Sequence, residues 1–100
     1  MNTSIKEQNG EVLVLFSGRL DTAAAAQTEA DLKPLYNSEN KTIVLDCSQL
    51  EYISSSGLRI FLSLLKANKA KGGQVVITNM NDDIRNVFTM TGFNSLFQFR

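Results

Sequence analysis

The stretch Leu45–Leu65, LDCSQLEYISSSGLRIFLSLL, contains the strand-to-helix transition that decides the fold. Apolar residues run up to Asp46 and polar residues follow. Apolar residues then recur at the i, i+3, i+4, i+7 spacing of an amphipathic helix. The pattern predicts a buried strand over Thr42–Asp46, a loop over Cys47–Ser54 and a helix over Ser56–Lys71.

The beginning of that helix is a favourable place for an anion. Its first backbone N–H groups have no partner within the helix, and the helix dipole is positive there. The three serines from Ser54 to Ser56 therefore place hydroxyl groups where a phosphate would be held without unfolding the chain. Serine is also a favoured helix cap, so a plain capping loop explains the same residues. The residues alone leave both interpretations open.

Upstream of this stretch the sequence predicts a hairpin. Asn9-Gly10 favours a type I′ turn, and the runs on either side predict strands over Thr3–Glu7 and Glu11–Ser17. The second run, EVLVLFS, is almost continuously apolar, which predicts a strand that is buried on both faces.

A helix is predicted to follow the hairpin, over Thr22–Tyr36. The segment Gly18–Asp21 should break the preceding strand, and either Asp21 or Thr22 can cap the helix with a side-chain oxygen. Pro34 is expected to kink the helix or end it early, because proline has no N–H and clashes with the preceding turn.

The last third of the chain predicts one more strand, a helix and an edge strand. Gly72-Gly73 should end the helix that follows the serines, and a short strand is expected over Gln74–Thr78. Asn81 is the expected cap of the last helix, which Gly92 stops. Ser95–Phe99 is expected to form the edge strand.

The predicted order is β-β-α-β-α-β-α-β, which belongs to the α/β class. We expect a single domain over residues 1–100, with a mixed and mostly parallel sheet, an N-terminal antiparallel hairpin and crossover helices. Sites in such sheets lie beyond the carboxyl ends of the strands. Gly18–Thr22 and Ser54–Gly57 should therefore lie at the same end of the molecule, without touching.

Composition excludes several functions. Ten basic and ten acidic residues cancel, so charge gives no argument for binding nucleic acid or an anionic membrane. No apolar run is long enough for a membrane span or a signal peptide core, and the single Cys47 cannot form an internal disulfide. We expect a cytoplasmic protein with Cys47 as a small buried residue.

The sequence offers no catalytic residues. It has no histidine, which rules out Ser-His-Asp and Cys-His arrangements, and with one cysteine it also rules out ordinary zinc sites. The SSSG sequence does not match G-x-S-x-G, and neither nucleotide-binding glycine motif occurs. We therefore expect no enzyme, no cofactor and no metal.

Short motifs that are weak individually occur in a fixed order and at fixed spacing: Gly18–Asp21, Ile43–Asp46, Tyr52–Arg59, Gly72-Gly73, Ile84–Phe88 and Thr91-Gly92. Together they resemble the STAS domain family, and within it the small bacterial anti-sigma factor antagonists, from Gly10 to Phe99. The resemblance implies a phosphorylation site at Ser55, two places before the motif's glycine. It implies as partner an anti-sigma factor that is itself a serine kinase, which binds the unphosphorylated protein and releases a sigma factor. A phosphatase would restore the unphosphorylated form.

The resemblance also implies a surface around Ser55 that binds the partner. Its expected members are Asp21, Thr22, Ser54, Ser56, Gly57 and Arg59. Many family members have Asp where this chain has Ser54, which removes a carboxylate from that surface. An alternative is a constitutive STAS adaptor of a transporter or signalling assembly that is not phosphorylated. A third hypothesis is a sensor that binds a small molecule or nucleotide at the same helix start.

Overall fold

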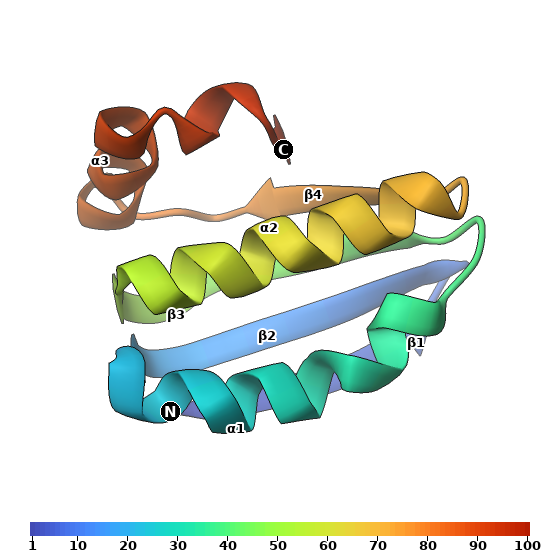
Figure 1. Cartoon of the computed structure of the whole chain (residues 1–100), viewed down its shortest axis with the longest axis horizontal. Helices are drawn as coiled ribbons and strands as arrows, with labels where there is room; N and C mark the ends of the chain where they lie inside the picture. Colours follow the sequence, from blue (N-terminus) through green and yellow to red (C-terminus); the bar gives the residue numbers. More distant parts are fainter.

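The computed structural model describes every residue from Met1 to Arg100 and confirms the α/β class (Figure 1). Its elements are β1 (Asn2–Gln8), β2 (Glu11–Leu20), α1 (Thr22–Leu32), the 3₁₀ helix η1 (Lys33–Asn37), β3 (Thr42–Ile53), α2 (Ser55–Ala70), β4 (Gln74–Thr78), α3 (Asp82–Thr91), the 3₁₀ helix η2 (Phe93–Ser95) and β5 (Gln98–Phe99). One sheet has the order β1-β2-β3-β4-β5. β1 is antiparallel to β2, and the other neighbouring pairs are parallel.

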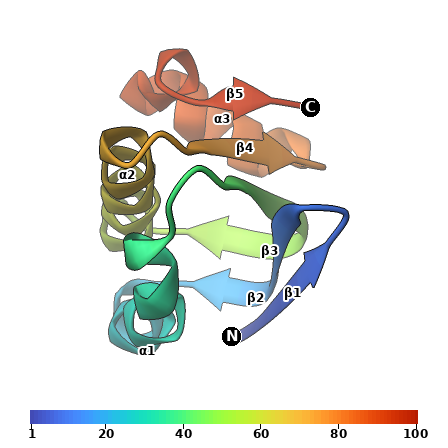
Figure 2. The same cartoon turned by 90° about the vertical axis from the view of Figure 1, so that its right-hand side faces the viewer.

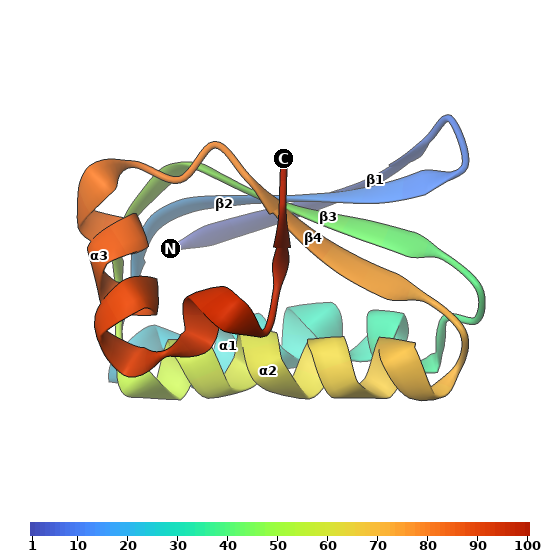
Figure 3. The same cartoon turned by 90° about the horizontal axis from the view of Figure 1, so that it is seen from above.

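Helices α1 and α2 lie side by side on one face of the sheet, and the opposite face carries no helix (Figures 2 and 3). Right-handed crossovers that step through a sheet in one direction place their helices on the same side. Val12, Val14 and Phe16 of β2 are therefore buried, whereas Leu13 and Leu15 are only partly buried. The prediction that this strand is buried on both faces is wrong for that reason.

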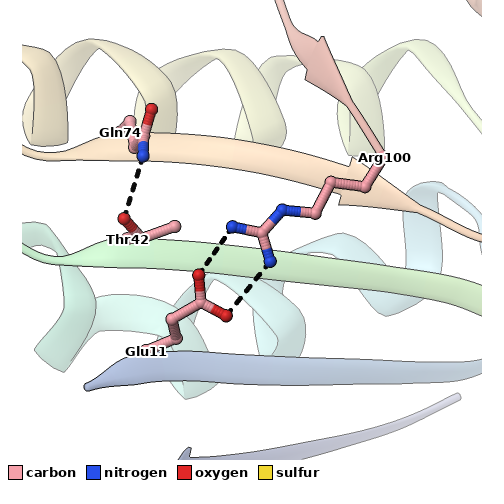
Figure 4. Close-up of polar contacts among 4 residues, drawn as sticks. All are labelled: Glu11, Thr42, Gln74 and Arg100. Carbon is pink, nitrogen blue, oxygen red and sulfur yellow. Dashed lines mark hydrogen bonds and ion pairs between the residues drawn. The ribbon is translucent and has the colours of Figure 1, made fainter. Parts of the chain in front are cut away.

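Polar side chains cross the uncovered face of the sheet. The guanidinium of Arg100 reaches from β5 across β4 and β3 and donates hydrogen bonds of 2.6 and 3.1 Å to the Glu11 carboxylate (Figure 4). These hydrogen bonds lower the pKa of Glu11. The Gln74 side chain donates to the Thr42 hydroxyl at 3.0 Å on the same face. The two contacts join β2 to β5 and β3 to β4, and β1 takes no part in them.

β2 and β3 are both longer than predicted. Gly18–Leu20 continues β2 and Cys47–Ile53 continues β3, so the break at Gly18–Asp21 and the loop over Cys47–Ser54 are wrong as predicted. The two extensions pair with each other across shifts in register: Gly18 with Leu50, Arg19 with Tyr52, Leu20 with Ile53. Their exposed polar residues hid the strand pattern, because such side chains sit comfortably on the solvent side of a strand.

Helix ends differ from the prediction by small amounts. α1 ends at Leu32 and η1 follows with Pro34 in its first turn, so the early end expected from the proline is confirmed. α2 begins at Ser55 rather than Ser56. The last strand is only Gln98–Phe99, since η2 takes up Ser95 and a turn over Leu96 and Phe97 follows it.

Several local predictions are confirmed. Asn9 and Gly10 have positive φ angles of 53° and 77°, as a type I′ turn requires. The Asn81 side chain accepts a 2.9 Å hydrogen bond from the Ile84 N–H and caps α3. Gly92 ends that helix with a left-handed φ of 78°.

Candidate functional site

The candidate site is built around the first turn of α2, which Ser54 caps. The Ser54 Oγ accepts a 3.2 Å hydrogen bond from the Gly57 N–H, and its carbonyl accepts one of 2.9 Å from the Leu58 N–H. The amides of Ser55 and Ser56 have no backbone acceptor. The helix therefore begins with two free N–H groups and with no acidic residue in its first turn.

The three serines have different surroundings, although their side chains are the same. Ser54 is only 8% exposed, because its hydroxyl is turned inward as the cap. Ser55 is exposed at the first position of α2, and Ser56 is partly buried and faces α1. Ser55 is thus the hydroxyl of the three that a protein in solution can reach most easily.

Gly57 seats the start of α2 directly against the end of β2. A Cβ atom on this glycine would lie 2.8 Å from the Leu20 Cγ and 2.8 Å from the Ile53 Cγ1. The Ser54 N–H also donates a 2.9 Å hydrogen bond to the Leu20 carbonyl. The two predicted segments therefore touch, contrary to expectation, because β2 runs on to Leu20.

The residue after Leu20 is Asp21, which caps α1. Its Oδ1 accepts a 2.9 Å hydrogen bond from the Ala24 N–H. The carboxylate is partly buried, and the cap role predicted for Asp21 is confirmed. The starts of α1 and α2 are thus brought to the same end of the molecule, as Figure 1 shows.

A shallow groove of about 350 Å³ runs between α1 and α2 beside these helix starts. Thr22 and Glu29 line it from α1, and Ser56, Arg59 and Ser63 line it from α2. Ala25 and Ala26 of α1 also line the groove, and because their side chains are small they leave space between the two helices. Three of the predicted surface residues, Thr22, Ser56 and Arg59, therefore share one groove.

Arg19 and Tyr52 are exposed neighbours of the site that the sequence did not single out. The Arg19 guanidinium lies 4.4 Å from the centre of the Tyr52 ring, within cation–π range. They stand opposite each other in the paired ends of β2 and β3. Sequence reasoning could have found this pair only by extending both predicted strands, and the polar residues in the extensions concealed the strand pattern.

The remaining side chains that could bind a metal or react as nucleophiles form no such site. No group of three or more metal-ligating side chains occurs. Cys47 is fully buried, as predicted. Its burial, and to a smaller extent the negative charge of Asp46, raises the pKa of its thiol to about 12. No helix is long and apolar enough to cross a membrane.

Known proteins are similar to this chain in sequence and in fold. A family model described as STAS domain matches residues 2–100. BtrV of Bordetella bronchiseptica, described as an anti-sigma factor antagonist, is 32% identical over 97 residues, which cover 97% of this chain and 84% of BtrV.

Solved structures agree with the fold described above. A Thermotoga maritima protein described as an anti-sigma factor antagonist superposes with a TM-score of 0.87 at 21% identity, covering 97% of this chain and 84% of the other. The antagonist SpoIIAA superposes in its unphosphorylated and phosphorylated forms with TM-scores of 0.75 and 0.74, each at 20% identity. These matches cover 99% of this chain and 87% and 91% of the two SpoIIAA chains.

Proposed function

This chain belongs to the STAS domain family, and we propose that it acts in the cytoplasm as an anti-sigma factor antagonist switched off by phosphorylation of Ser55. In the unphosphorylated state it binds an anti-sigma factor that is a serine kinase, and this binding releases a sigma factor. A phosphatase reverses the modification. The protein itself catalyses nothing in this scheme.

The exposure of Ser55 is the observation that carries the proposal. Its hydroxyl stands at the first position of α2, where the Ser55 and Ser56 amides are free and no carboxylate is near in the helix. A phosphate adds about −1.5 to −2 charges at neutral pH. The helix start would stabilise that charge, so the fold should survive the modification.

Loss of binding then follows from the interface and needs no large rearrangement. A partner seated over Ser55 would meet the bulk and the charge of a dianion. A hundredfold loss of affinity corresponds to only ~2.7 kcal/mol, which one misplaced charge at an interface can supply. Both forms of SpoIIAA keep the fold that this chain has, which supports a switch of this kind.

The proposed partner surface combines two kinds of residue. Thr22, Ser56 and Arg59 would touch the partner through the groove between α1 and α2. The partly or fully buried residues that hold the two helix starts in place would act through that geometry: Asp21, Ser54 and Gly57. Many family members have Asp at the position of Ser54. Because the Ser54 side chain is buried, this difference affects the cap of α2 more than the exposed surface.

The test is affinity purification from the native host with Ser55→Ala and Ser55→Asp, followed by mass spectrometry of the retained proteins. Ser95→Asp is the matched control, since it adds the same charge at an exposed serine beyond α3. We expect the Ala form and the control to retain a serine kinase of the anti-sigma type, and the Asp form to lose it by about a hundredfold.

The opposite result identifies the competing functions. If Ser55→Ala and Ser55→Asp retain the same transporter or assembly protein equally, the serine is a plain helix residue and the domain is a constitutive adaptor. If neither retains a protein and a nucleotide or inorganic phosphate raises the melting temperature, the domain is a ligand sensor.

A further inference from the structure

The outer edge of β1 is a free sheet edge whose protection consists of the two charged residues Lys6 and Glu7. β1 runs over Asn2–Gln8 in regular register with β2, with no bulge and no proline. All of its residues except Thr3 are exposed. No segment of the chain covers its outer side (Figure 2). Proteins commonly shield an edge strand with a bulge, a proline, a covering segment or charged side chains, and β1 has only the last of these.

The pairing with β2 determines which backbone groups point outward. A two-residue type I′ turn makes the residues on either side of it, Gln8 and Glu11, a hydrogen-bonded pair. Antiparallel strands alternate between residues that bond to one neighbour and residues that face the other side. Thr3, Ile5 and Glu7 therefore present their N–H and C=O groups to solvent.

The sequence of this edge is complementary to itself. When two copies of β1 pair antiparallel about a two-fold axis at Ile5, Ile5 faces Ile5, Thr3 faces Glu7 and Ser4 faces Lys6. No like charges stand opposite each other. The Ile5 side chain, which is 40% exposed in the single chain, is covered by an equally apolar one.

The two symmetric registers centred on charged residues bring like charges together. Pairing about Lys6 would set two ammonium groups directly opposite each other, which is destabilising. Pairing about Glu7 would do the same with two carboxylates. In the register about Ile5, Glu7 faces the uncharged Thr3 of the other copy.

We propose that two copies of this chain associate through β1, antiparallel and centred on Ile5, so that their two sheets become continuous. Every outward N–H group of Thr3, Ile5 and Glu7 then finds an outward C=O group of the other copy. The two-fold axis stands perpendicular to the sheet, so the helices of both copies lie on the same side. A single strand pair is a small interface, so the dimer is weak and depends on concentration.

The dimer leaves the candidate site open. α2 begins directly after β3, which is separated from β1 by β2, and the new contact covers only the outer edge of β1. Dimerisation therefore stands apart from the proposed switch, and either can fail without the other. If both hold, one dimer carries two copies of Ser55, at opposite ends of the joined sheet.

The test combines mass and hydrogen exchange on the purified chain from about 1 µM to about 1 mM. Sedimentation equilibrium should show the mass rising from 11.1 kDa toward twice that value. Amide hydrogen exchange followed by NMR should show the Thr3, Ile5 and Glu7 amides becoming protected as concentration rises. The amides that β1 already bonds to β2 should be protected throughout.

A pair of matched variants identifies the register. Ile5→Lys places two ammonium groups opposite each other and should weaken dimerisation about tenfold or more. Gln8→Lys adds the same charge on the same strand, where the partner residue is Asn2, and should leave the dimer nearly unchanged. Circular dichroism checks that both variants keep the fold.

Two results would overturn the proposal. One is a mass of 11.1 kDa at every concentration with the Thr3, Ile5 and Glu7 amides exchanging freely. The other is a dimer that Ile5→Lys leaves intact, because such a dimer must use another surface.

Discussion

Helices α2 and α3 begin with the same capping geometry, but only α3 has acidic residues in its first turn. Ser54 accepts from the Gly57 N–H at 3.2 Å, and Asn81 accepts from the Ile84 N–H at 2.9 Å. α3 follows its cap with two acidic residues, whereas α2 has none in its first turn. α3 therefore carries its own permanent anions, and α2 offers hydroxyl groups at the place where an anion would be favourable.

The two helix starts also differ in how they are anchored. The first turn of α2 is pressed against β2 and β3 through Gly57, with no room for a side chain. Asn81 and the acidic residues after it are exposed, but Ile84 in the first turn of α3 is buried in the core. The Asn81 Nδ2 also donates a 3.0 Å hydrogen bond to the Leu50 carbonyl. Packing positions both helices, and α3 is held in addition by a polar side chain at its cap.

The largest effect should come from filling the space at Gly57. Gly57→Ala places a Cβ within 2.8 Å of Leu20 and Ile53 atoms that are not the free ends of their side chains. We expect a loss of about 1–3 kcal/mol in the free energy of unfolding, measured by urea denaturation. Ser56→Ala, at the preceding and partly buried position, is the control and should change stability little. A more stable Gly57→Ala would show that helix propensity outweighs the close packing.

The next largest effect should come from the caps, and it should differ between the two helices. Asn81→Ala removes the cap of α3 and leaves the Leu50 carbonyl without its side-chain donor, which we expect to cost about 2 kcal/mol. Ser54→Ala removes a single hydrogen bond and should cost about 1 kcal/mol. Ser54→Asp should cost little, because aspartate caps equally well. Equal losses for the two alanine variants, in paired denaturation curves, would contradict this difference in anchoring.

The sequence predicts these helix starts well because their signals are local. A cap and the N–H group that donates to it lie three residues apart, so Asn81 could be assigned, and the cap of α1 narrowed to Asp21 or Thr22, before the fold was known. The position of α2 within the serine run was harder to predict. A difference of one residue in the helix start decides that Ser54 is a buried cap and Ser55 is exposed.

What the sequence missed depends on contacts between distant segments. Cys47–Ile53 forms strand because it pairs with the end of β2, and that pairing also brings Arg19 onto Tyr52. The uncovered face of the sheet follows from the handedness of the crossovers, which no single strand reveals. Of the residues proposed to bind a partner, Thr22, Ser56 and Arg59 share one groove, and their role stays a prediction.

The smallest effect should come from charge at the first position of each helix. Ser55→Asp adds an anion to a helix start that has none, and should raise the free energy of unfolding by about 0.3–1 kcal/mol at low ionic strength. Asp82→Asn removes one of two anions from α3 and should lower it by a similar or smaller amount. Ser55→Asn is the matched uncharged control for the first change.

Salt separates the charge from other consequences of these substitutions. The Debye length falls to about 3 Å at 1 M salt, so both effects should largely disappear there if they arise from the helix dipole. Ser55→Asn should show no such dependence. If Ser55→Asp instead destabilises the chain at every ionic strength, α2 does not accommodate an anion at its start. The phosphorylated protein would then have to unfold this turn, and loss of partner binding would follow from a change in shape rather than from a charge placed in the interface.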